Sequence, residues 1–237
     1  MIPVAKVPEP ATFAALARQP GQQWLAKHPD TTRPKPLWIP FTPALAEGFH
    51  GLCAYAAMRD PTGGTVDHYL SYKNHPQLAY EWSNYRFASG ALNACKRTAD
   101  EAVLDPYEVG QGWFEILLPS LQMRVTDAVP AEMRAKAEYT LTRLKLRDGE
   151  RILRWRQSWY VMYLQGELTL EGLRRVAPLI AQAVDNTKTP AASAVPNPTP
   201  ASANYMLIRT QAELDAWLAR LRAAPVVSFD TETTSLD

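Results

Sequence analysis

The chain has 237 residues, of which 46% are hydrophobic, so it is long enough to bury a sizeable core in one large domain or two small ones. Its formal net charge is +1, so the overall charge does not indicate binding to nucleic acid or to a membrane surface. Two cysteines, Cys53 and Cys95, are too few for a disulfide framework. No apolar run approaches the roughly 20 residues of a membrane span. We therefore expect a reduced, cytoplasmic protein without a membrane partner.

The hydrophobic pattern predicts a few short strands among many helices. In chain order the expected elements are helices over 11–25 and 43–49, a strand over 65–69, a helix over about 89–98, a strand over 113–118, and helices over 131–146, 148–165 and 167–184. Gly63 and Gly64 predict a tight turn that joins the strand at 65–69 to a preceding strand. Thr169 is the expected N-cap of the last helix. This mixture indicates the α+β class.

A change of composition marks a boundary late in the chain. Residues 187–204 consist mostly of Ala, Pro, Ser, Thr and Asn. Such a segment cannot bury enough apolar surface to offset the entropy lost on ordering, so we expect a Pro-rich linker of extended character. The expected organisation is one domain over 1–186, the linker over 187–204 and a separate piece over 205–237.

Four short stretches carry the most specific pattern. They are LCAY at 52–55, TVDHY at 65–69, LAYEWSNY at 78–85 and LNACK at 92–96. Together they resemble the ββα-metal core of HNH endonucleases, above all the HNH proteins of bacterial anti-phage systems that act beside an ATPase. The resemblance covers residues 50–97 closely and extends loosely to about residue 184. It implies a small ββα-metal core, a mostly helical extension over 131–184, DNA as substrate, an ATPase partner and a role in defence.

The same resemblance implies roles for individual side chains. His68 would be the general base that takes a proton from water, and Asn84 would fix the loop that orients it. Asp67 and Asn93 would hold one divalent ion, Mg²⁺ or Mn²⁺, which stabilises the charge that develops on the phosphate. Lys96 would contact a phosphate. Hydrolysis of a phosphodiester needs these parts because the water must be activated and the negative charge must be stabilised.

The positions of a structural zinc depart from the family pattern. Many relatives carry two CxxC pairs that bind this zinc. The corresponding positions here are Cys53, Ala56, Ser89 and Leu92, so only one of four ligands remains and a structural zinc is not expected. Two interpretations stay open: packing replaces the metal, or the domain is a decayed relative.

Basic side chains are concentrated in the helices expected after residue 130. Residues 133–156 contain eight Lys and Arg against three Asp and Glu. The expected nucleic-acid contacts are Lys96, Arg97, Arg143, Lys145 and Arg147, because basic side chains bind phosphate oxygens and release counterions. The alternative is a solvated helix face that covers an aromatic core.

The last stretch, 205–237, is expected to form a strand, a helix and a strand. Its motifs LDAWL at 214–218 and VVSFDTET at 226–233 resemble the opening of the 3′–5′ exonuclease domain of bacterial DNA polymerase I. In that family an Asp-x-Glu motif binds the catalytic metals, which implies Asp230 and Glu232 as an incomplete metal motif. We expect this truncated β-α-β fragment to be inactive alone, because a two-metal site needs more carboxylates.

Three functional hypotheses follow. The leading one is a metal-dependent HNH endonuclease that acts on DNA. The alternatives are a non-catalytic nucleic-acid-binding or partner-docking protein on a decayed HNH scaffold, and an N-terminal fragment of an unusual DNA polymerase I-like repair enzyme. Convergence of Asp67, His68 and Asn93 on one point would favour the first hypothesis over the second.

Overall fold

A computed structural model describes residues 1–188, 210–211 and 215–218 of the chain. The chain divides into two units, Met1–Ala191 and Ala192–Asp237. In the second unit, residues 215–218 are helical, within the expected helix. Most of the expected linker, the two expected strands after it, Asp230 and Glu232 lie outside the described residues. In the described part, no helix is both long and apolar enough to cross a membrane.

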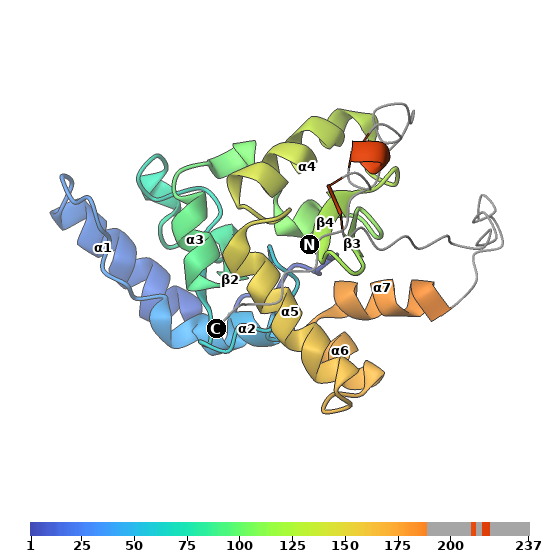
Figure 1. The fold of residues 1–237 in the computed structure, drawn as a ribbon. Coiled ribbons are helices and arrows are strands. Elements are labelled where there is room, and N and C mark those ends of the chain that lie inside the picture. Colours follow the sequence, from blue (N-terminus) through green and yellow to red (C-terminus); the bar gives the residue numbers. More distant parts are fainter. Residues whose placement is uncertain (189–209, 212–214, 219–237) are drawn as a thin grey trace. The chain divides into compact units, whose positions relative to one another are not determined.

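The first unit belongs to the α+β class, as predicted, and combines helices with two small antiparallel sheets (Figure 1). The helices are α1 (Gln19–Lys27), α2 (Thr42–Gly48), α3 (Gly90–Lys96), α4 (Ala131–Arg143), α5 (Glu150–Leu164), α6 (Leu170–Val176) and α7 (Pro178–Lys188), and the strands are β1 (Thr65–His68), β2 (Tyr85–Ala88), β3 (Phe114–Leu117) and β4 (Gln122–Val125). Short π and 3-10 turns lie between them, at Ala14–Arg18, Ile39–Phe41, Pro76–Leu78, Trp82–Asn84, Asp100–Ala102 and Pro106–Glu108.

The pairing of β1 corrects one prediction. The turn lies one step earlier than predicted: the Gly63 amide donates to the Asp60 carbonyl at 3.1 Å, so Pro61 and Thr62 are its central residues. Gly63 and Gly64 follow it with φ of 89° and 68°, and the turn does not join two strands of a hairpin. β1 pairs instead with β2, which follows a long loop, and His68 stands opposite Tyr85 in the register. Gly64 lies against the ring of Phe87 on β2, where a side chain of its own would clash. β1 thus pairs with a strand that lies about 20 residues further along the chain, and the local sequence does not indicate this pairing.

The expected helix over 167–184 is also wrong in one respect, because the chain forms two helices there. Ala177 leaves the helical region, with φ of −153° and ψ of 67°, between α6 and α7. Its successor Pro178 causes the break, since proline disfavours a helical conformation in the preceding residue. The expected N-cap is confirmed: the Thr169 hydroxyl accepts a hydrogen bond from the Gly172 amide at 3.0 Å.

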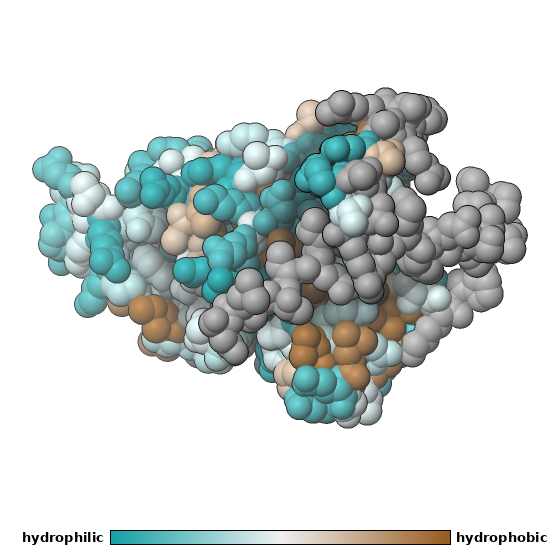
Figure 2. Space-filling model, in the orientation of Figure 1, coloured by the Kyte–Doolittle hydropathy of each residue, from teal (hydrophilic) through white to brown (hydrophobic). Residues whose placement is uncertain are grey.

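One core contains side chains from all parts of the first unit. β3 lies within its predicted range, whereas β4 was not predicted, although its apolar Met123 and Val125 alternate with polar residues. The view in Figure 2 shows a mostly hydrophilic surface over α1 and α3, with apolar residues gathered over α6.

Arg156 on α5 is buried in this core without a carboxylate partner among the described residues. Its guanidinium donates to the carbonyl oxygens of Leu146, Leu121 and Arg147 at 2.6, 2.8 and 3.3 Å. Burial lowers the pKa of Arg156 to about 10. The side chain therefore connects α5 to the loop after α4 and to the turn between β3 and β4.

Replacing Arg156 should destabilise the fold strongly. In Arg156→Ala the three carbonyl oxygens lose their donor in a buried site, so we expect a loss of about 3 kcal/mol in the free energy of unfolding. Arg154→Ala is the matched control, because Arg154 is exposed and its one carboxylate partner in the described part of the chain is Glu150 on the same helix. That variant should change stability by less than about 0.5 kcal/mol. Urea unfolding measures both, and equal effects would contradict the proposed role of Arg156.

Candidate active site

The candidate site is formed by β1, β2 and α3. The two strands pair antiparallel, and α3 follows β2 directly and packs against β1. Asp67 and His68 end β1, Asn84 immediately precedes β2, and Asn93 lies in the middle of α3. Because α3 begins directly after β2, the helix lies close to the strand pair and contacts β1.

A cavity of about 570 Å³ opens at this place. Asp67, His68 and Asn93 all line it, so the structure brings these three predicted residues to one site. The other lining residues are Arg33, Pro36, Trp38, Val66, Ser71, Tyr72, Lys73, Arg97 and Thr98.

The His68 ring is held in a single orientation. Its Nε2 lies 2.9 Å from the carbonyl oxygen of Ala79. A carbonyl only accepts, so Nε2 carries the proton and the neutral ring keeps the lone pair of Nδ1. Burial, chiefly, lowers the pKa of His68 to about 4, so the imidazole is neutral at pH 7. A neutral, oriented imidazole of this kind is able to accept a proton.

Asn84 holds the loop that follows β1. Its side-chain oxygen accepts from the Leu70 amide at 2.8 Å, and its side-chain nitrogen donates to the carbonyls of Leu70 and Leu78 at 2.9 and 3.3 Å. Ala79, which accepts the His68 hydrogen bond, directly follows Leu78. Asn84 is 6% exposed, so it acts on the site only through this loop.

Asp67 and Lys96 form a buried pair. The Lys96 ammonium donates to Asp67 Oδ1 at 3.1 Å and to the His68 carbonyl at 2.8 Å, and its side chain is fully buried. The Tyr55 hydroxyl donates to Asp67 Oδ2 at 2.6 Å. Burial, then the Asp67 charge, raises the pKa of Tyr55 well above its ordinary value, so it stays a donor. The expected phosphate contact of Lys96 is wrong for this structure, because the ammonium faces inward.

The side-chain oxygen atoms at the cavity are of the kind that binds a hard cation such as Mg²⁺. The Asn93 amide nitrogen donates to the Val66 carbonyl at 3.3 Å, which leaves the amide oxygen for another partner. With the Asp67 carboxylate this gives two oxygen ligands, and Mg²⁺ commonly takes the rest of its shell from water and phosphate. The described residues contain no group of three or more His, Cys, Asp or Glu able to hold a metal. A cation here would therefore depend on oxygens of its substrate.

Three basic side chains, Arg33, Lys73 and Arg97, line the same cavity. In the described part of the chain, none of them pairs with a carboxylate. Arg97 also has an unusual backbone, with φ of 53° and ψ of −118° after α3. The cavity thus combines these positive charges with the buried imidazole of His68.

The other expected nucleic-acid contacts lie elsewhere. Arg143 donates to the Lys96 carbonyl at 3.1 Å, and Arg147 pairs with Glu138. Lys145 lines a second cavity of about 490 Å³, between α3 and the beginning of α5. Of the five basic residues predicted to bind nucleic acid, only Arg97 lines the cavity that contains His68.

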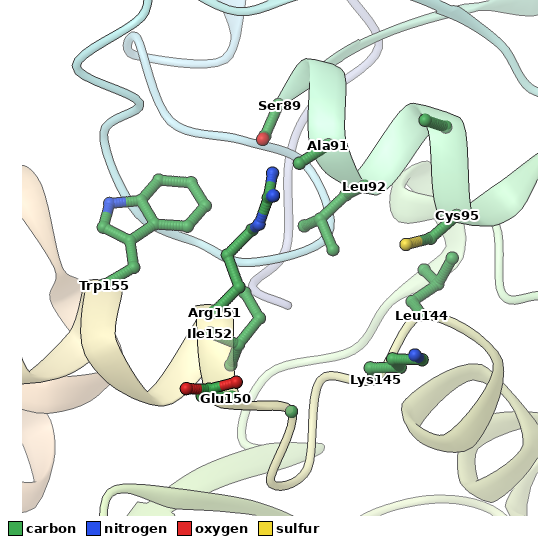
Figure 3. A pocket seen from close by; sticks show the side chains of 12 residues that line it. Ser89, Ala91, Leu92, Cys95, Leu144, Lys145, Glu150, Arg151, Ile152 and Trp155 are labelled. Carbon is green, nitrogen blue, oxygen red and sulfur yellow. The ribbon is translucent and has the colours of Figure 1, made fainter.

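Figure 3 shows the second cavity, in which Arg151 extends from α5 toward the first turn of α3 and Cys95 points inward. Its lining is largely apolar, with Leu92, Leu144 and Ile152 among its members. Its titratable side chains are Cys95, Lys145, Glu150 and Arg151, and it contains no histidine.

The four positions compared with a zinc site are packed together. Cys53 is buried, and its sulfur accepts a hydrogen bond from the Ser89 amide at 3.2 Å. Ala56 and Leu92 are buried in the core. Cys53 is the single zinc-ligand type among the four, and the other three positions are buried Ala, Ser and Leu.

Sequence reasoning missed several residues of the site. Trp38 and Tyr72 line the cavity and contact His68, with ring centroids 4.6 and 5.1 Å from the imidazole. Arg33 and Lys73 were missed as well. Nothing in the local sequence pattern around Trp38 indicates His68 as its neighbour.

No protein-family profile matches this chain, and no curated protein matches it at a significant level.

The burial of His68 should make the stability of the metal-free protein depend on pH. The unfolded chain binds a proton at the ordinary pKa of 6.5, whereas the folded protein resists protonation until about pH 4. Stability is therefore full above about pH 6.5 and decreases as the pH falls toward 4. Between pH 7 and 5 the wild type should lose about 2 kcal/mol more than His68→Gln. Urea unfolding in EDTA measures this, and identical pH profiles would contradict it.

The backbone at Arg97 predicts an unusual response to glycine. Glycine adopts a φ of 53° freely, whereas other residues are strained there. Arg97→Gly and Arg97→Ala remove the same charge, so their comparison isolates the backbone. The glycine variant should be more stable than the alanine variant by about 1 kcal/mol in thermal or urea unfolding. An alanine variant as stable as the glycine variant would show that no strain exists at this position.

Proposed function

We propose that this chain is a metal-dependent HNH-type endonuclease that hydrolyses phosphodiester bonds in DNA. One observation carries the proposal: Asp67, His68 and Asn93, from a strand end and a helix, line one cavity. Basic side chains that have no carboxylate partner among the described residues line the same cavity. Free positive charge at a cavity attracts phosphate, and a neutral histidine beside it is suited to activate water.

The order of elements supports an HNH-like core. Two antiparallel strands separated by a long loop, with a helix directly after the second strand, correspond to the ββα arrangement that the sequence resemblance implies. The packing of Cys53 against Ser89, with buried Ala56 and Leu92, supports the interpretation that apolar contacts replace the zinc of relatives.

In the proposed reaction, His68 Nδ1 accepts a proton from the attacking water. The Ala79 carbonyl holds the other ring nitrogen, and Asn84 holds the loop that carries Ala79. Asp67 and Asn93 would hold the divalent ion, which when bound stabilises the charge of the transition state and of the leaving oxygen. Lys96 and Tyr55 keep the Asp67 carboxylate in place. Arg33, Lys73 and Arg97 would bind phosphates.

A second candidate is a non-catalytic nucleic-acid-binding protein on a decayed scaffold. It is favoured by the state of Asp67, both of whose oxygens already have partners in Tyr55 and Lys96. A divalent ion would have to share this carboxylate with an ammonium. The defence role, the ATPase partner and the polymerase-fragment alternative rest on sequence resemblance alone and stay predictions.

A plasmid-nicking assay with Mg²⁺ or Mn²⁺ tests the proposal. His68→Ala should lower the cleavage rate by about 100-fold or more, because the general base is lost, while DNA binding persists. EDTA should abolish cleavage by the wild type.

The matched control is His50→Asn. His50 is exposed and has a φ of 55°, a conformation that asparagine tolerates, and it does not line the cavity. This variant should cleave as the wild type does. Cleavage by His68→Ala at the wild-type rate would refute the catalytic proposal. Absence of cleavage by both proteins, with DNA binding retained, would favour the decayed scaffold.

A further inference from the structure

Two aromatic rings stand beside His68 and face the cavity. Trp38 precedes the 3-10 turn Ile39–Phe41, and Tyr72 lies in the loop after β1. Both side chains are partly exposed, unlike the buried aromatic residues of the core such as Phe13 and Tyr85. In the described part of the chain, neither the Trp38 indole nitrogen nor the Tyr72 hydroxyl has a hydrogen-bond partner. Packing and hydrogen bonding among the described residues therefore leave part of each ring exposed.

The rings have a definite geometry relative to the base. Trp38 and Tyr72 are inclined by only 28°, with centroids 6.4 Å apart. Each stands nearly perpendicular to the His68 ring, at 81° for Trp38 and 90° for Tyr72. A flat group that stacks on either aromatic face would thus be held beside the imidazole, in an orientation set by the pair.

Positive charge flanks the aromatic pair. Lys73 follows Tyr72 in the chain, Arg33 lies on the segment that carries Trp38, and Arg97 directly follows α3. A stacked base with its neighbouring phosphates has this combination of a flat apolar face and negative charge. A volume of about 570 Å³ lies within the usual range for pockets that hold small organic groups.

We infer that this site takes single-stranded or locally unpaired DNA, with one unpaired base stacked against Trp38 or Tyr72 and its phosphates on Arg33, Lys73 and Arg97. In an intact duplex the faces of the bases are covered by their neighbours, so only an unpaired base offers a face to an aromatic side chain. The inference rests on the proposed function, because it names the form of the substrate that the same cavity accepts.

The test measures binding rather than cleavage, with the full chain in EDTA and at one fixed salt concentration. The probes are a labelled single strand of DNA and the duplex of the same sequence, compared by fluorescence anisotropy. The wild type should bind the single strand about tenfold more tightly than the duplex. Tyr72→Leu should lose about tenfold in affinity for the single strand and little for the duplex. Tyr72→Phe keeps the ring and should bind as the wild type does.

Two further measurements make the result specific. Tyr139→Leu removes an exposed tyrosine on α4, away from the cavity, and should leave both affinities unchanged. A 2-aminopurine base in the single strand should lose fluorescence on the wild type and on Tyr72→Phe, and lose less on Tyr72→Leu. A wild type that binds the duplex as tightly as the single strand, or a Tyr72→Leu variant with full affinity for the single strand, would overturn the inference. Loss of nicking alone would not, because the binding assay needs no catalysis.

Discussion

The buried ion pair between Lys96 and Asp67 is the contact on which the candidate site depends. Lys96 comes from α3 and Asp67 from β1, and the ammonium also donates to the carbonyl of His68. Tyr55 adds a third segment through its bond to Asp67. An unpaired charge in this interior would be very unfavourable, so the segments are held where all three partners meet. The position of the base is thus a consequence of satisfying one buried carboxylate.

The same burial places the base under an electrostatic constraint. A histidine with a pKa of about 4 is neutral at pH 7 but accepts a proton weakly. On the proposed function, a bound phosphodiester brings negative charge close to the ring, and negative charge raises the pKa of a histidine. A divalent ion on Asp67 acts in the opposite direction. On the proposed function, the basicity of His68 during cleavage therefore depends on these two charges as well as on its burial.

Sequence reasoning placed the residues whose position follows from local structure. Asp67 and His68 are consecutive on a short strand and Asn93 lies on a nearby helix, so a motif of fixed spacing brings them close. It misplaced Lys96, because a lysine is expected at the surface and its partners Asp67 and Tyr55 belong to separate segments. The position of Trp38 could not be predicted from the sequence, because packing between distant segments brings its ring to the cavity.

The ion pair also decides which substitutions report on the chemistry. Asp67→Ala would leave the Lys96 ammonium buried without its partner, at a cost of about 3–5 kcal/mol, so loss of activity would not separate a lost metal ligand from a lost fold. Asn93 differs, because it is partly exposed and its side chain makes one long hydrogen bond, to Val66. Replacing Asn93 therefore breaks few contacts of the fold, while it removes an oxygen atom that would bind the ion on the proposed function. Metal dependence is therefore best examined at Asn93, and the base at His68, while Asp67 reports mainly on how the site is held together.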